Sequence, residues 1–240
     1  MTSRASKRLL KDIEAVHAAA LKAQGLFYWM DESNCLKGKA LLVGHDGTPY
    51  EGLLGLFDFT VPSDYPFAPP QVEWKTWDGK TRFHPQLYVG GKVCLSILGT
   101  WSGPGWSSMM NLESVLQILQ SLFVENPLAC EPGYEKGTLE DPKYKAYRDY
   151  VEHQVVQYMF QMIVSWQRKK QGHPWEPFEE DISPILPRLF EKLKQKVINH
   201  TEEQAFPVLS FGCSGKTNWA HLRTLMPKIE AAFLTPEKVE

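Results

Sequence analysis

The sequence feature that most restricts the fold is a proline-rich segment at residues 62–70, which reads PSDYPFAPP. Proline has no backbone N–H to donate, and it disfavours the helical conformation in the residue before it. Four prolines within nine residues therefore exclude a helix and leave few donors for a sheet. We expect a rigid, extended connection here, so that the regular elements must lie on either side of it.

Regular patterns precede this segment. Apolar residues recur at helical spacing over residues 3–24, and Gly25 follows as a stop signal. Four strand-like stretches come next, at residues 26–30, 38–43, 51–61 and 71–75. One helix followed by four strands predicts an α+β fold, in which helices pack on one face of a four-stranded antiparallel meander.

The second half begins with a long irregular segment at residues 81–110, which contains five glycines and almost no periodicity. Such a segment inside a compact domain usually carries function. Helical spacing returns at 111–125 and 142–170, and shorter helices are predicted near 182–199 and 218–234.

Composition narrows the class of protein. The chain has 240 residues, of which 43% are hydrophobic and 22% charged, as in globular proteins that bury a core. A net charge of -2 gives no reason to expect nucleic-acid binding, and no apolar run is long enough to predict a membrane span. The four cysteines show no ligand spacing, which argues against a zinc site and a disulfide framework. We expect a reducing, cytoplasmic location, with the nucleus as a further compartment.

The irregular segment holds the one promising chemical constellation. It contains RFHPQ at residues 82–86 and, after seven intervening residues, CLSIL at residues 94–98. A loop cysteine with a carboxamide and a histidine upstream can be a nucleophile, with the amide donating to an oxyanion. The alternative is that Cys94 is an ordinary buried cysteine. Spacing alone leaves both interpretations open.

Several motifs, in order, resemble the ubiquitin-conjugating enzyme family over residues 4–165. The proline-rich segment is similar to that family's proline-rich loop, and residues 84–86 read His-Pro-Gln where the family has His-Pro-Asn. Cys94 lies at the family's separation and is followed by Leu-x-Ile-Leu. Residues 91–101 and 131–135 resemble the branch of large conjugating enzymes with C-terminal extensions, which includes the one served by the alternative ubiquitin-activating enzyme.

The resemblance implies a ubiquitin-conjugating domain at residues 1–165 and a helical C-terminal extension at residues 166–240. Cys94 would accept ubiquitin, or a ubiquitin-like protein, from an activating enzyme as a thioester. It would then pass this acyl group to a substrate lysine or to a ubiquitin ligase. No cofactor and no metal are expected on this chain, because ATP is used by the activating enzyme.

The resemblance also assigns roles around Cys94. Gln86 stands where the family's Asn supports the oxyanion or holds the active-site loop, with one more methylene and hence a different reach. His84 and Pro85 would fix the turn, His84 by hydrogen bonding and Pro85 through its locked φ. The alternative for His84 is a role as a general base. Glu131 is the nearest acidic residue able to orient an incoming lysine; the alternative is a solvated loop carboxylate.

Partner surfaces are implied in the same way. Lys7, Arg8 and Lys11 match basic positions that the family presents to the activating enzyme, although exposed lysines on a helix are often only a solvated face. Phe67 matches the apolar loop residue that docks on ligases. The second docking loop reads Ser-Met where the family has Pro-Ala, and leaves Met109 as its apolar contact.

The sequence is compatible with two other functions. One is a catalytically weak or inactive ubiquitin-binding module of the same fold, although such variants typically lose the cysteine. The other is a thiol hydrolase, which would need a second histidine and a carboxylate in recognisable order. The GCSGKT run at residues 212–217 is similar to a phosphate-binding loop, but Ser210 stands where its first glycine is required.

Overall fold

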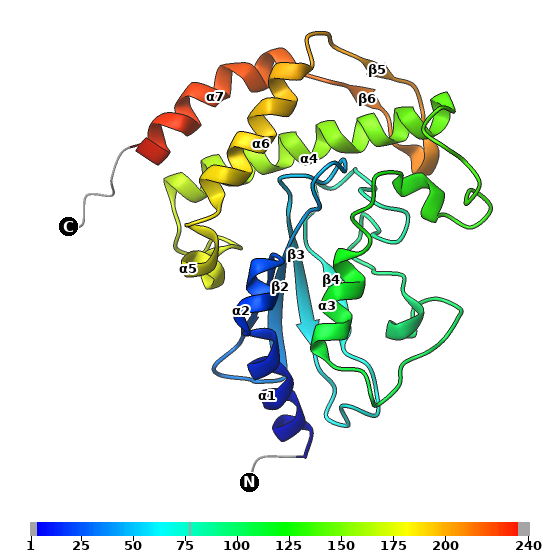
Figure 1. Cartoon of the computed structure of the whole chain (residues 1–240), viewed down its shortest axis with the longest axis vertical. Coiled ribbons are helices and arrows are strands. Elements are labelled where there is room, and N and C mark those ends of the chain that lie inside the picture. Colours follow the sequence, from blue (N-terminus) through cyan, green and yellow to red (C-terminus); the bar gives the residue numbers. More distant parts are fainter. Residues whose placement is uncertain (1–3, 77, 235–240) are drawn as a thin grey trace.

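The computed structural model describes residues 4–76 and 78–234, and its centre is a four-stranded sheet (Figure 1). The strand order is β1-β2-β3-β4, with every neighbouring pair antiparallel. The strands are β1 (Leu26–Met30), β2 (Lys37–Val43), β3 (Leu54–Thr60) and β4 (Gln71–Trp74). The predicted meander is therefore confirmed, with β3 beginning later than the sequence pattern indicates.

Helices pack on one face of this sheet. The N-terminal region forms α1 (Arg4–Val16) and α2 (Ala19–Ala23), and α3 (Leu112–Gln120) follows the irregular segment. At Gly55 in β3, an added Cβ would lie 2.8 Å from the Phe123 ring, just beyond α3. Glycine at this position therefore allows the residues after α3 to approach the sheet closely.

The single helix predicted over residues 3–24 is wrong in one respect, because the chain breaks between α1 and α2. Ala18 has an extended backbone, with φ of -59° and ψ of 139°. Next to it, His17 Nε2 is 2.9 Å from the carbonyl oxygen of Tyr28 in β1. A tertiary contact with the sheet therefore interrupts a helical pattern that is continuous in the sequence.

The helix α4 (Pro142–Arg168) joins the predicted domain to the predicted extension. Its N-terminus carries the expected signals, because Pro142 occupies the first turn and the Asp141 side chain accepts from the Lys143 N–H. The predicted boundary at residue 165 falls inside this helix, and the division into residues 1–165 and 166–240 stays a prediction. Side chains from both parts share one continuous buried cluster.

The extension contains α5 (Glu179–Ile182), α6 (Leu186–Asn199) and α7 (Trp219–Leu234), and α6 and α7 pack on α4 (Figure 1). Between α6 and α7 lies a small antiparallel hairpin of β5 (Ala205–Phe206) and β6 (Gly215–Lys216). Sequence patterns did not predict this hairpin, because two-residue strands are too short to show alternation.

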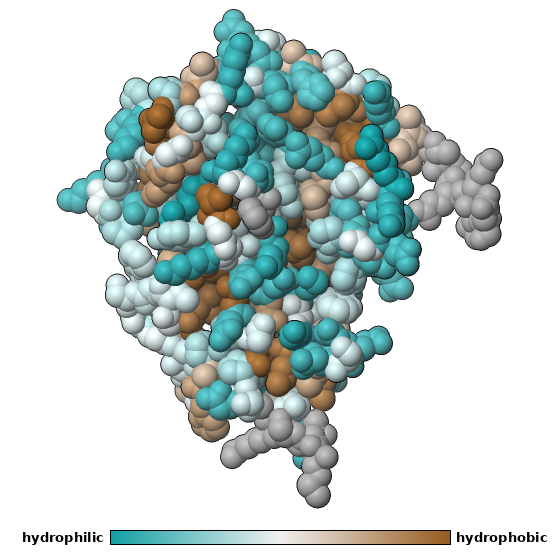
Figure 2. Space-filling model, turned by 180° about the vertical axis from the view of Figure 1, so that it is seen from behind, coloured by the Kyte–Doolittle hydropathy of each residue, from teal (hydrophilic) through white to brown (hydrophobic). Residues whose placement is uncertain are grey.

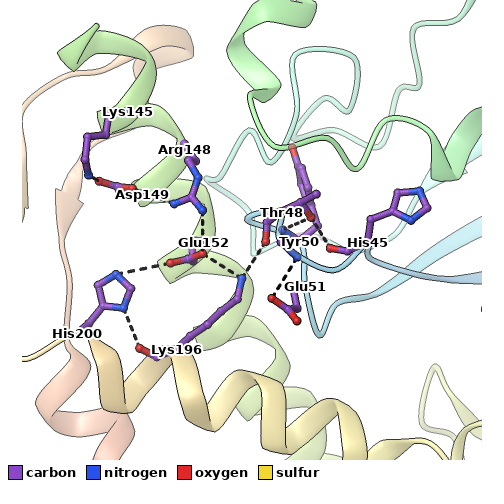
Figure 3. Close-up of polar contacts among 11 residues, drawn as sticks. His45, Thr48, Tyr50, Glu51, Lys145, Arg148, Asp149, Glu152, Lys196 and His200 are labelled. Carbon is purple, nitrogen blue, oxygen red and sulfur yellow. Dashed lines mark hydrogen bonds and ion pairs between the residues drawn. The ribbon is translucent and has the colours of Figure 1, made fainter. Parts of the chain in front are cut away.

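A buried ionic contact ties α6 to α4 and to the loop after β2 (Figure 3). Lys196 Nζ lies 3.0 Å from Glu152 Oε2 and donates to the carbonyl oxygen of Thr48, also at 3.0 Å. His200 Nε2 and Arg148 approach the same carboxylate at 3.6 and 3.8 Å. Burial lowers the pKa of Lys196, although Glu152 opposes this effect. The extension is therefore held by a specific polar contact as well as by apolar packing.

Hydrophobic side chains on the face shown in Figure 2 form separate areas among hydrophilic ones. Within the described part of the chain, no helix is long and apolar enough to cross a membrane.

Candidate active site

The segment that leads into the predicted active site is held at two successive backbone carbonyls. Tyr147 on α4 donates its hydroxyl to the carbonyl oxygen of Arg82 at 2.6 Å. Tyr50 donates its hydroxyl to the carbonyl oxygen of Phe83 at 2.6 Å. Both tyrosines are fully buried, and burial raises the pKa of each hydroxyl, which keeps them protonated donors. The backbone before His84 is therefore fixed from two directions.

His84 itself lies under the surface, with no exposed area. Its Nδ1 atom accepts the Gln86 N–H at 3.1 Å, which closes the turn around Pro85. Burial, helped by the nearby Arg82 charge, lowers the pKa of His84 to about 3. The ring is thus neutral near pH 7, with Nδ1 as an acceptor. These properties favour the turn-fixing role predicted for His84 over a role as a base.

Cys94 is joined to the same turn by its backbone. Its N–H donates to the carbonyl oxygen of Gln86 at 2.9 Å, and Leu87 and Val93 form a bridge beside it. On the other side, the Thr100 hydroxyl donates to the carbonyl oxygen of Val93 at 2.6 Å. The cysteine is therefore held in a defined backbone position although it lies in an irregular segment.

The Cys94 side chain is only 2% exposed, yet it lines a small surface pocket. The pocket encloses about 40 Å³, whereas one water molecule needs about 10–15 Å³. Its lining consists of Pro85, Gln86, Tyr88, Cys94, Trp101, Cys130, Glu131 and Pro132. Cys94 therefore lies at the edge of the core, and a peptide tail must widen the pocket to reach its sulfur.

The pocket brings together most of the residues predicted to act. Gln86 and Glu131, which are distant in sequence, both line it with Cys94, and both side chains are partly exposed. Sequence analysis missed Tyr88 and Trp101 as lining residues. The only available signal was that aromatic residues occur in a glycine-rich loop, where they have no helix or strand face to fill.

Arg82 is a third residue that was not predicted from the sequence to have a role. Its guanidinium lies 3.3 Å from the centre of the Tyr88 ring. Its Nε donates to the carbonyl oxygens of His84 and Pro85, at 3.3 and 3.2 Å, and a terminal nitrogen also donates to Pro85. One cation therefore binds the two carbonyls immediately before Gln86.

The basic residues predicted on the first helix differ in their surroundings. Lys7 and Lys11 are exposed on α1. Arg8 is instead half-buried, pairs with Asp12 at 2.9 Å, and donates to the carbonyl oxygen of Met110 at 2.9 Å. From residue 7 onward, the exposed positive charges of α1 are therefore the two lysines, while Arg8 anchors the loop that carries Met109.

The two apolar residues predicted to meet ligases lie on loops that are linked to each other. Phe67 is 68% exposed and Met109 is 90% exposed. The Trp106 indole N–H donates to the carbonyl oxygen of Pro66 at 2.7 Å, which ties the loop around Phe67 to the loop around Met109. Both apolar side chains are open to solvent.

No metal centre is evident in the structure: within residues 4–76 and 78–234, no group of three or more His, Cys, Asp or Glu side chains could hold an ion.

Comparison with known proteins places this geometry in a family. The family model described as "Ubiquitin-conjugating enzyme" matches residues 8–158. This chain belongs to the ubiquitin-conjugating enzyme family. The solved E2 domain of a Toxoplasma gondii ubiquitin conjugating enzyme superposes with a TM-score of 0.50 at 22% identity, covering 64% of this chain and 98% of that one. That similarity supports the fold.

Individual relatives are similar at higher identity. The proteins named "Ubiquitin-conjugating enzyme E2 Z" from Xenopus tropicalis and Homo sapiens are 42% and 41% identical over 150 residues. These matches cover 62% of this chain, and 47% and 42% of the two relatives. The "Probable ubiquitin-conjugating enzyme protein 17" of Caenorhabditis elegans is 37% identical over 191 residues, covering 75% of this chain and 25% of that protein. The chain spans less than half of the length of each of these relatives.

Proposed function

We propose that this chain carries ubiquitin, or a ubiquitin-like protein, as a thioester on Cys94 and transfers it to lysine amines or to a ligase. The observation that carries this proposal is that Cys94, Gln86 and Glu131 line one pocket. The pocket lies within residues 8–158, which match the family model.

The first step is an exchange of acyl partners between two sulfur atoms. The Cys94 thiolate attacks the thioester carbonyl carbon of the charged activating enzyme, and a new carbon–sulfur bond forms. The bond to the activating enzyme's cysteine breaks, and its sulfur leaves as a thiolate that takes up a proton. Because one thioester is exchanged for another, the step needs no further energy source. ATP is consumed earlier, by the activating enzyme.

The second step transfers the acyl group to nitrogen. A lysine amine attacks the thioester carbonyl, the carbon–nitrogen bond forms, and the carbon–sulfur bond to Cys94 breaks. The amine loses a proton and the Cys94 sulfur regains one, so the thiol is restored. Negative charge builds on the carbonyl oxygen during the attack, and the Gln86 amide is the donor proposed to stabilise it. Glu131, which lines the same pocket, is proposed to orient the amine.

The remaining residues are proposed either to hold the active-site turn or to bind partner proteins. His84 and Pro85 are proposed to hold the turn that presents Gln86. Lys7 and Lys11 are proposed to meet the activating enzyme, and the loops bearing Phe67 and Met109 to meet ligases. A cytoplasmic and nuclear location stays a prediction.

One observation favours a second candidate, a ubiquitin-binding module without catalysis. Cys94 is only 2% exposed, and its pocket holds about 40 Å³. In such a module the pocket would stay closed, and ubiquitin would bind elsewhere without forming a bond. A thiol hydrolase, by contrast, would cleave a ubiquitin ester rather than retain the acyl group.

A charging assay separates these functions. The full chain is incubated with ATP, an activating enzyme, and ubiquitin or a ubiquitin-like protein, and products are resolved without reducing agent. We expect an adduct that reducing agent removes and that Cys94→Ala does not form. Non-covalent ubiquitin binding with no adduct from either ubiquitin-activating enzyme would favour the binding module and contradict our proposal.

A further inference from the structure

The hairpin of the C-terminal extension reaches the segment that holds the active-site turn. From β5 and β6 it runs beside α4 toward the N-terminal end of that helix (Figure 1). Its tip, residues 209–213, is closed by hydrogen bonds between Leu209 and Cys213 at 2.7 Å and between Cys213 and Ser210 at 3.4 Å. Cys213 is 2% exposed, so one side of the tip is packed against the rest of the chain.

Phe211, at the end of this tip, contacts two residues of the catalytic region. Its ring centre lies 4.9 Å from the Arg82 guanidinium carbon. Its ring also meets the Tyr147 ring edge-on, with 5.6 Å between centroids. A guanidinium within about 6 Å of an aromatic centroid is attracted by the ring. Since Tyr88 also lies under Arg82, two aromatic rings restrict the same cation.

The restricted cation is connected to Cys94 through the backbone of residues 84–86. Arg82 donates to the carbonyl oxygens of His84 and Pro85. Gln86 follows directly, and its own carbonyl oxygen accepts the Cys94 N–H. Phe211 is therefore linked to Gln86 and Cys94 through Arg82 and the backbone of the turn.

The backbone of Phe211 is unusual in a way that points to this contact. Its φ is 62° and its ψ is 22°, and no other non-glycine residue in the described ranges has a positive φ. This left-handed conformation is unfavourable for a bulky side chain. Phe211 is still 36% exposed, so burial of its side chain offsets only part of the cost of this backbone conformation. Unfavourable conformations that persist commonly mark a functional constraint.

We propose that Phe211 is a positioning residue for transfer from Cys94. By restricting Arg82, the extension holds residues 84–86 in the geometry that aims the Gln86 amide at the thioester. This inference rests on the proposed function, because it concerns the same thioester. It assigns the extension a part in the reaction, which sequence analysis left open.

The proposal predicts a difference between the two steps of the reaction. Without the ring, Arg82 has more freedom and the carbonyls before Gln86 lose a fixed donor. A displacement of about 1 Å in a positioned group can lower a rate by about a hundredfold. We therefore expect Phe211→Ala to slow transfer to free lysine about tenfold. Charging should change by less than about threefold, because thiol exchange depends less on an aimed amide.

Three substitutions and a control distinguish the effect of the aromatic face of Phe211 from the effect of its volume. Phe211→Tyr retains the aromatic face and should transfer at the parent rate. Phe211→Leu keeps apolar volume but no π face, and should be as slow as Phe211→Ala. Val208→Ala is the matched control, because Val208 is 77% exposed in the same hairpin and should leave transfer unchanged.

Stability provides a readout that a merely structural role would not reproduce. Glycine adopts a φ of 62° without strain, so Phe211→Gly relieves the backbone while it removes the ring. We expect its Tm to stay within about 3 °C of the parent value, with transfer as slow as in Phe211→Ala. This variant also keeps the test valid if Phe211→Ala folds poorly.

The result that would overturn the inference is transfer by both Phe211→Ala and Phe211→Gly within about twofold of the parent chain, or parent-like transfer by Phe211→Leu. If the parent chain itself does not charge, the proposed function fails, and alkylation of Cys94 by iodoacetamide tests the positioning alone. With Cys35 as internal reference, we expect Phe211→Ala to speed Cys94 alkylation about threefold or more, because its pocket loosens. An unchanged alkylation ratio would contradict the inference.

Discussion

The N–H of Cys94 donates to the carbonyl oxygen of Gln86, with 2.9 Å between the two atoms. Gln86 also gives its own N–H to His84 Nδ1 at 3.1 Å. Both backbone groups of Gln86 are thereby fixed, and only its side chain is left to vary. Gln86 lines the same pocket as Cys94. Glutamine in place of the family's asparagine therefore changes how far the side-chain amide extends, and it leaves the backbone of the turn unchanged.

The reach of residue 86 can be tested with Gln86→Asn. The shorter side chain restores the family's residue on an unchanged turn and loses less rotamer entropy when its amide is aimed. We expect charging to be unaltered and transfer to free lysine to rise several-fold, up to about tenfold. Single-turnover discharge of purified thioester measures this directly. Unchanged discharge would mean that Gln86 already provides the donor or that the amide is only structural.

Burial of His84 should make stability depend on pH. The unfolded chain protonates this histidine near pH 6.5, whereas the folded chain does so only near pH 3. Between these values the unfolded state binds more protons, so stability is lost as pH falls from 6.5 toward 3. We expect His84 to account for a loss of about 2 kcal/mol in the free energy of unfolding between pH 7 and pH 5.

Urea denaturation at the two pH values, compared with His84→Asn, isolates this contribution. The asparagine side chain can still accept the Gln86 N–H but does not titrate in this range. Between pH 7 and pH 5, the variant should lose about 2 kcal/mol less of its free energy of unfolding than the parent does. Equal pH dependence in the two proteins would show that His84 does not stay neutral in the folded chain.

The buried contact between Lys196 and Glu152 should make α6 a necessary part of the folded unit. Lys196→Met leaves a buried carboxylate whose remaining cationic neighbours are at 3.6 and 3.8 Å. We expect a loss of about 3 kcal/mol in the free energy of unfolding, measured by urea denaturation at pH 7. Lys145→Met is a matched control, because its pair with Asp149 on α4 has an exposed lysine. That change should cost less than about 1 kcal/mol. Equal costs for the two variants would contradict the importance of the buried pair.

The exposed lysines of α1 should affect charging rather than transfer. Replacing Lys7 and Lys11 together by glutamate reverses the local charge and should slow charging about tenfold at low salt, with a smaller effect at 0.5 M salt because of screening. Transfer from preformed thioester should stay at the parent rate. Replacing Lys169 and Lys228 together by glutamate changes the net charge by the same amount and provides the control for charge alone. Slower charging by that control to the same extent would refute a specific role for α1.

The sequence predicted those elements whose patterns are local. The strand at 26–30 was placed correctly, because its apolar residues lie between a glycine stop and a turn. The break between α1 and α2 was missed, since it depends on the contact of His17 with the backbone of Tyr28. The β5–β6 hairpin was also missed, because its strands are short and its tip contains a phenylalanine where a turn favours glycine.

In the candidate site, too, residues that are close in sequence were predicted and residues brought together by folding were not. Cys94 and Gln86 were found together because seven residues separate them and one loop carries both. Trp101 and Cys130 reach the pocket through tertiary folding, which no spacing in the sequence reveals. The contact of Phe211 with Arg82 joins the extension to the catalytic region and has no local signal at all.

The proposed reaction requires the Cys94 sulfur to form the acyl bond, and Cys94→Ser replaces that sulfur with a nucleophilic oxygen. Oxygen in place of sulfur would form an ester, which resists thiol exchange, whereas the parent thioester does not. After charging with ATP and an activating enzyme, we expect the parent adduct to disappear in reducing agent and the Cys94→Ser adduct to persist. Cys130→Ala should behave as the parent does. A reducing-agent-sensitive adduct that remains in Cys94→Ser and disappears with Cys130→Ala would place the bond on the other thiol of the pocket and contradict the account.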